Sequence, residues 1–174
     1  MTTQHRPRPL LARKLDIVYL VFFVIHIPVM LLIDLAPFIP YPLRPQLSHT
    51  LRNFYIERYN DRFFSSPPAW FTMYMYLEAA YHLPLSAWMV WAIPNDHPLL
   101  ALNLLIFALE TAITTLTCVV EVASWDGYTA GQKGDLYSLY VPYLVVACLM
   151  GIDAFFRLKT QILGAKQAAK DKRA

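Results

Sequence analysis

A single carboxylic acid lies in the middle of an apolar, aromatic stretch, and this limits what the chain can fold into. Residues 67–84 begin with two prolines and run through aromatic and aliphatic side chains to Glu78, with His82 four residues later. Four residues make about one helical turn, so Glu78 and His82 are expected on one face. In a bilayer a carboxylate costs about 3 kcal/mol or more, so Glu78 should face a partner, a ligand or a wet cavity.

The composition indicates a membrane protein of one domain. The chain has 174 residues, of which 57% are hydrophobic and 16% charged, whereas about a quarter of a soluble domain is charged. Its net charge is only +3 and its basic residues gather at the two ends, which argues against a nucleic-acid-binding face. Cys118 and Cys148 lie in apolar runs and are interpreted as buried thiols. We therefore expect no nucleic-acid partner, no metal and no cofactor.

Four apolar segments are long enough to cross a bilayer, which takes about 20 residues of helix. They predict an all-α polytopic membrane protein, a four-transmembrane-helix bundle. The first segment is too long for a signal peptide and lacks a small-residue cleavage site. The predicted spans cover residues 15–36, 68–93, 98–122 and 136–157.

The placement of Lys and Arg predicts the orientation of these spans. Four lie in the N-terminal tail and six from Arg157 onward, against four in the 37–66 loop and one after the third span. The positive-inside rule then places both termini in the cytosol. The expected organisation is a cytosolic tail (1–14), a membrane domain (15–158) with a lumenal loop (37–67), and a basic cytosolic tail (159–174).

Two lysines near the C-terminus suggest a localisation signal. Lys170 and Lys172 stand five and three places from the end of the chain, which is the dilysine pattern that retrieves membrane proteins to the endoplasmic reticulum. A generic basic tail is the alternative. In the 37–66 loop, Arg58 and Arg62 are the expected partners of Glu57 and Asp61.

Three carboxylates occupy three different predicted spans, and we expect them to converge in one cavity lined by aromatic side chains. These are Asp34, Glu78 and Glu110. A cationic amine would fit by charge pairing and cation–π contact, and a sterol would fit against the apolar walls. For Asp34, a water-exposed position at the end of its helix stays open. The same three acids can also move protons across a double bond, so catalysis stays an alternative.

Short motifs over nearly the whole chain match one family. They are His26-Ile27-Pro28 with Asp34, Asp61 with Pro67-Pro68-Ala69-Trp70-Phe71, Glu78 with Leu83-Pro84, and Tyr140-Val141-Pro142-Tyr143-Leu144. In these motifs the chain resembles the EXPERA-domain membrane proteins, and among them the sigma-2 receptor (transmembrane protein 97) family. The resemblance implies a four-helix bundle of the endoplasmic reticulum membrane, often a homodimer, with a cavity for sterols and lipophilic amines.

The resemblance also implies roles for single residues. Asp34 and Glu78 match the pocket acids, and Asp61 matches an important acid of the lumenal side. His82 stands where the receptor branch has a polar amide, so ligand preference is expected to differ. The full set expected to bind ligand is His26, Asp34, Glu78, His82, Glu110, Thr114, Thr115, Tyr140 and Tyr143.

The family also contains isomerases, the emopamil-binding proteins, which use a His and a Glu one turn apart. Here Met30 follows His26 at that spacing and departs from the pattern, whereas Glu110-Thr111 resembles the Glu-Thr of their next catalytic helix. We therefore predict a non-enzymatic, receptor-like protein that binds sterols or lipophilic amines, with a role in sterol homeostasis or client handling. Its expected partner is a sterol-transport or client membrane protein. The alternative is a sterol or terpenoid isomerase or cyclase that uses Glu110, Glu78 and Asp34.

Overall fold

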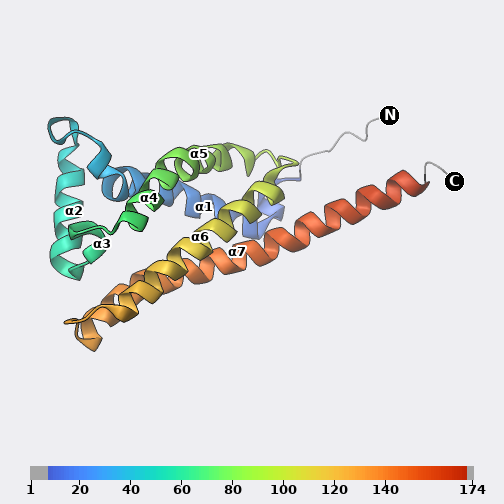
Figure 1. The fold of residues 1–174 in the computed structure, drawn as a ribbon. Helices are drawn as coiled ribbons and strands as arrows, with labels where there is room; N and C mark the ends of the chain where they lie inside the picture. Colours follow the sequence, from blue (N-terminus) through green and yellow to red (C-terminus); the bar gives the residue numbers. More distant parts are fainter. Residues whose placement is uncertain (1–7, 172–174) are drawn as a thin grey trace.

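The computed structural model describes residues 8–171, and all regular secondary structure in this range is helical (Figure 1). The all-α prediction is thus confirmed for these residues. Short 3-10 turns occupy Leu10–Ala12, Ala36–Phe38 and Tyr41–Leu43, and π-helical turns occupy Met30–Asp34 and Glu78–His82. The α-helices are α1 (Lys14–Val29), α2 (Gln46–Tyr59), α3 (Arg62–Ser65), α4 (Ala69–Leu77), α5 (Leu83–Ala92), α6 (Leu100–Ser124) and α7 (Ala130–Asp171).

Three helices among the described residues are long and apolar enough to cross a membrane. They are Lys14–Asp34, which is α1 with its π turn, and then α6 and α7. The segment predicted as the second span consists of α4, a π turn and α5, which follow one another from Ala69 to Ala92. Because this segment is broken into three pieces, the count of four spans stays a prediction.

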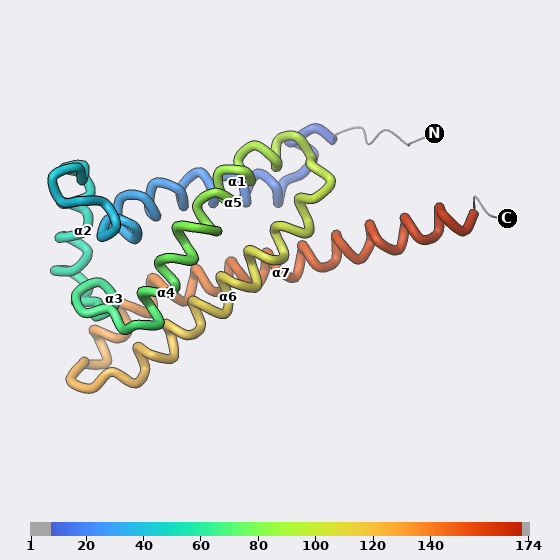
Figure 2. Tube along the Cα trace, turned by 45° about the horizontal axis from the view of Figure 1, so that its top comes forward, coloured from blue at the N-terminus to red at the C-terminus, as the bar shows by residue number. Residues whose placement is uncertain are grey.

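The helices form an elongated bundle with two distinct ends. Helices α6 and α7 lie side by side and run antiparallel, and α1 packs on α5 (Figures 1 and 2). The start of α1 and the turn between α5 and α6 lie at one end, whereas α2, α3 and the turn between α6 and α7 lie at the other. Helix α7 has 42 residues, so at 1.5 Å per residue it is about 63 Å long. It extends past the bundle, and residues 159–171 of the expected tail continue it.

The turn before α7 carries the sequence signature of a helix start. Thr129 Oγ1 accepts a hydrogen bond from the Gln132 amide (3.2 Å), and Gln132 Oε1 accepts one from the Thr129 amide (2.9 Å). This reciprocal pair is a capping box. It allows α7 to begin six residues before the predicted span.

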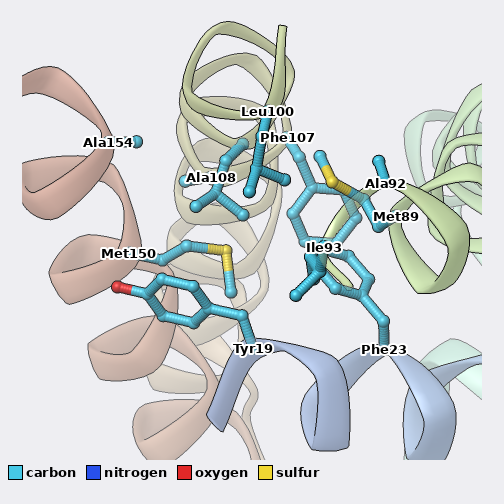
Figure 3. Close-up of a cluster of buried hydrophobic side chains, with 11 residues drawn as sticks. Tyr19, Phe23, Met89, Ala92, Ile93, Leu100, Phe107, Ala108, Met150 and Ala154 are labelled. Carbon is cyan, nitrogen blue, oxygen red and sulfur yellow. The ribbon is translucent and has the colours of Figure 1, made fainter. Parts of the chain in front are cut away.

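A buried apolar cluster joins α1, α5, α6 and α7 (Figure 3). Tyr19 and Phe23 reach from α1 toward Met89 on α5 and Met150 on α7, and the Phe23 and Phe107 rings lie 4.9 Å apart. The Phe107 ring also lies 4.6 Å from the ring of His82. The cluster therefore packs against His82 through the Phe107 ring.

A buried ionic network ties the start of α1 to α5 and α7. Asp16 is fully buried, and its two carboxylate oxygens contact the guanidinium groups of Arg13 and Arg157. Arg13 also donates to the backbone carbonyl of Ile93 (2.9 Å). Arg157 also contacts Asp153 (2.8 Å). Asp16 is therefore the shared counter-ion of two arginines.

Candidate functional site

One cavity of about 300 Å³ lies between α1, α4, the following π turn, α6 and α7. Its walls are largely apolar and aromatic, with Ile33, Phe64, Phe71, Met75 and Leu139 among them. All nine residues that were predicted to bind ligand line it: His26, Asp34, Glu78, His82, Glu110, Thr114, Thr115, Tyr140 and Tyr143. The three acids thus share one cavity, as expected from their cost in lipid. Their roles in binding stay predictions.

Each of the two acids Asp34 and Glu78 belongs to a π-helical turn. Asp34 ends the turn Met30–Asp34, after which the Leu35 amide donates to the Met30 carbonyl five residues back (2.8 Å). Glu78 begins the other turn, and its carbonyl accepts from the Leu83 amide. Pro84 explains the second widening, because its ring would clash with the carbonyl four residues earlier in a regular α-helix. Such π turns are frequent at functional sites.

Helix α2 holds the widened end of α1 in place. The carbonyls of Leu32 and Ile33 accept hydrogen bonds from the Ser48 hydroxyl (2.5 Å) and the Arg52 guanidinium (3.0 Å). Arg52 also donates to the Phe64 carbonyl (3.0 Å). These bonds satisfy backbone groups in a region that lacks a continuing helix. They fix Asp34 at the cavity wall, so its position is set by α2 as well as by α1.

The three acids differ in their partners. His82 Nε2 contacts Glu110 Oε2, which joins the π turn to α6. Within residues 8–171, the carboxyl groups of Asp34 and Glu78 form no hydrogen bond or ion pair, although the charge of Arg52 is close enough to attract Asp34. The cavity therefore presents two carboxyl groups that lack a bonded partner, and a third that already has one.

Aromatic groups surround the His82 contact. The His82 ring lies 6.5 Å from that of His26, and the Tyr143 hydroxyl lies 3.4 Å from His26 Nε2. Both histidines are buried. This end of the cavity is a compact set of imidazole, phenol and carboxyl groups, and the Phe107 ring packs against both histidines.

Asp61 lies just outside the cavity and positions two of its tyrosines. It is fully buried, and its carboxylate accepts hydrogen bonds from the hydroxyls of Tyr55 (2.8 Å) and Tyr140 (2.6 Å) and from the Phe63 amide (2.9 Å). Burial raises the pKa of this carboxyl, and the hydrogen bonds from Tyr140, Tyr55 and Phe63 oppose that rise. Both tyrosines line the cavity.

The expected pairing of Arg58 and Arg62 with Glu57 and Asp61 is wrong. Arg58 contacts Asp135 at the start of α7 (2.7 Å). Arg62 donates to the Asp126 carbonyl (2.7 Å) and covers the rings of Trp125 and Tyr128. The reason is that Asp61 caps α3 and points inward, whereas both arginines reach across to the α6–α7 turn.

Sequence reasoning missed some of the cavity lining. Tyr55, Thr111 and Cys118 line it as well. Thr111 was foreseeable, because it follows Glu110 and lies four residues before Thr115 on one helix face. Tyr55 lies in the predicted lumenal loop, and only the tertiary packing of α2 over the end of α1 turns it toward the cavity.

The fold and the cavity together define a helical membrane protein with an acidic internal pocket. The sequence profile of the EXPERA family (EXPanded EBP superfamily) matches residues 47–154, so the chain belongs to this family. Sigma intracellular receptor 2 of Xenopus tropicalis is 26% identical over 83% of this chain and 90% of its own length. The human protein of that name is 25% identical, over 74% and 80%. Efficient mitochondria targeting-associated protein 19 of Schizosaccharomyces pombe is 29% identical, over 87% and 81%.

Proposed function

We propose that this chain is a receptor-like membrane protein that binds a lipophilic amine or a sterol in the cavity. The observation that carries the proposal is the pair of carboxyl groups, Asp34 and Glu78, that face a largely apolar space without a bonded partner. A cationic nitrogen supplies the missing charge, and the apolar walls take the hydrocarbon body of the ligand. The rings of Tyr140 and Tyr143 in the wall add cation–π contacts.

The proposal includes a setting in the cell. We place the chain in the endoplasmic reticulum membrane with four spans and both termini in the cytosol, and with a homodimer as its assembly. The similarity to proteins named as receptors supports a receptor-like role, and sterol homeostasis or the handling of a client membrane protein would be its task. Lys170 of the proposed retrieval signal lies in the last turn of α7. Lys172 lies outside the described residues.

Binding of a cationic probe tests the proposal. N-benzylpiperidine carries one cationic nitrogen and fits a cavity of this size. Asp34→Asn or Glu78→Gln should each weaken its binding to purified protein about thirtyfold or more, since removing one partner of a desolvated charge pair costs about 2 kcal/mol or more. Glu57→Gln, on the exposed side of α2, is the matched control and should leave the affinity unchanged. Equal affinity in all four proteins would contradict the proposal.

The same purified protein also tests the alternative that this chain is an isomerase. Met30, one turn after His26, is fully buried and does not line the cavity, so the structure offers no acid at that position. Incubation with a sterol that carries a ring double bond should give no shifted product. If the wild type converts the sterol and Glu110→Gln does not, the chain is an enzyme and the receptor proposal is wrong.

A further inference from the structure

The third acid of the cavity differs from the other two in its contact with a histidine. Glu110 comes from α6 and His82 from the π turn, so their side chains approach from two walls. The side chain of His82 is 8% exposed and that of Glu110 is 21% exposed. Among the described residues, no other basic side chain contacts Glu110.

The contact changes which carboxyl groups a ligand meets. Asp34, Glu78 and Glu110 all line the cavity. Because His82 Nε2 already contacts Glu110 Oε2, this third carboxyl group has a partner inside the protein and is not left for a ligand. Asp34 and Glu78 then remain, and Glu78 is close enough to Asp34 for their charges to interact.

We propose that His82 engages Glu110 and thereby leaves Asp34 and Glu78 as one anchoring site, so that the cavity prefers ligands with one cationic nitrogen. This inference rests on the proposed function and names its ligand class. His82 is a specificity-determining residue that acts through Glu110. Without His82, the Glu110 carboxylate becomes a second anchoring point for cations, and ligands with two charged nitrogens gain affinity.

Two probes that differ by one charge test the inference. They are N-benzylpiperidine and its analogue with a primary amine on the ring carbon opposite the nitrogen. The quantity measured is the ratio of their dissociation constants in the wild type and in His82→Gln, Glu110→Gln and the double variant. His82→Gln should shift this ratio about tenfold toward the dicationic probe, which corresponds to about 1.4 kcal/mol. Glu110→Gln alone should leave the ratio unchanged, and the double variant should restore the wild-type value.

The Glu110→Gln variant tests the inference even if His82→Gln does not fold. If Glu110 is free to bind cations in the wild type, Glu110→Gln lowers the affinity for the dicationic probe, and the inference is overturned. An unchanged ratio in His82→Gln that folds normally overturns it as well. His49→Gln, which removes a histidine outside the cavity, is the control and should leave the ratio unchanged.

The outcomes separate this inference from the proposed function. If neither probe binds the wild type, or if Asp34→Asn and Glu78→Gln leave binding unchanged, the proposed function fails. If binding requires Asp34 and Glu78 but the probe ratio does not respond to His82→Gln, only the inference fails.

Discussion

Asp16→Ala is expected to lower the free energy of unfolding by about 3 kcal/mol, because it removes the carboxylate that the guanidinium groups of Arg13 and Arg157 share. The side chains of Arg13 and Asp16 are 3% and 0% exposed, so water cannot replace the lost carboxylate, and Asp96, 3.6 Å from Arg13, compensates only in part. Arg157 is 26% exposed and keeps its contact with Asp153. Most of the loss therefore arises at Arg13. Denaturation of the purified protein in detergent, followed by circular dichroism, measures the change.

Two further variants isolate the cause of this loss. The double replacement Arg13→Met with Asp16→Leu removes the isolated charge together with its partner, and should recover more than half of the stability that Asp16→Ala loses. Arg58→Ala breaks an ion pair whose two side chains are half exposed, and should cause no measurable change. If Asp16→Ala is as mild as Arg58→Ala, the network does not hold α1 against α5 and α7.

Much of the fold could be predicted from local patterns. The apolar runs gave helices where α1, α6 and α7 lie, and the double proline at 67–68 marked the start of α4 at Ala69. The two π turns could not be predicted. The spacing of apolar residues does not distinguish a turn whose amide bonds the carbonyl four residues earlier from one whose amide bonds the carbonyl five residues earlier. The extension of α7 to Asp171 was also missed in part, since a basic, alanine-rich tail forms a helix as readily as a coil.

The sequence predicted which acids line the cavity better than which side chains contact one another inside it. The cost of a carboxylate in lipid was enough to bring Asp34, Glu78 and Glu110 to one space. In contrast, spacing linked His82 to Glu78 on its own helix, whereas its contact is with Glu110 on α6. Partner choice depends on how the π turn rotates the helix, and this rotation is a property of the packed structure.

Asp61→Ala is expected to lower the free energy of unfolding by about 3 kcal/mol and to weaken ligand binding. The variant leaves three donors without an acceptor, namely the buried Phe63 amide and the partly buried hydroxyls of Tyr55 and Tyr140. Because both tyrosines line the cavity, their release also disturbs its shape. Thermal denaturation and N-benzylpiperidine binding measure the two effects on one preparation.

Most of this expected loss of stability comes from the two tyrosine hydroxyls. Repeating Asp61→Ala in a protein that lacks both hydroxyls tests this. In a Tyr55→Phe, Tyr140→Phe protein the two hydroxyl donors are absent, so Asp61→Ala should cost only about 1 kcal/mol, for the Phe63 amide. Asp61→Asn in the wild type should fall between these values, because its single carbonyl oxygen can still accept from the hydroxyls while its amide faces another donor. Equal losses in both backgrounds would mean that Asp61 acts through the α3 cap alone. The tyrosines of the cavity would then hold their positions without it.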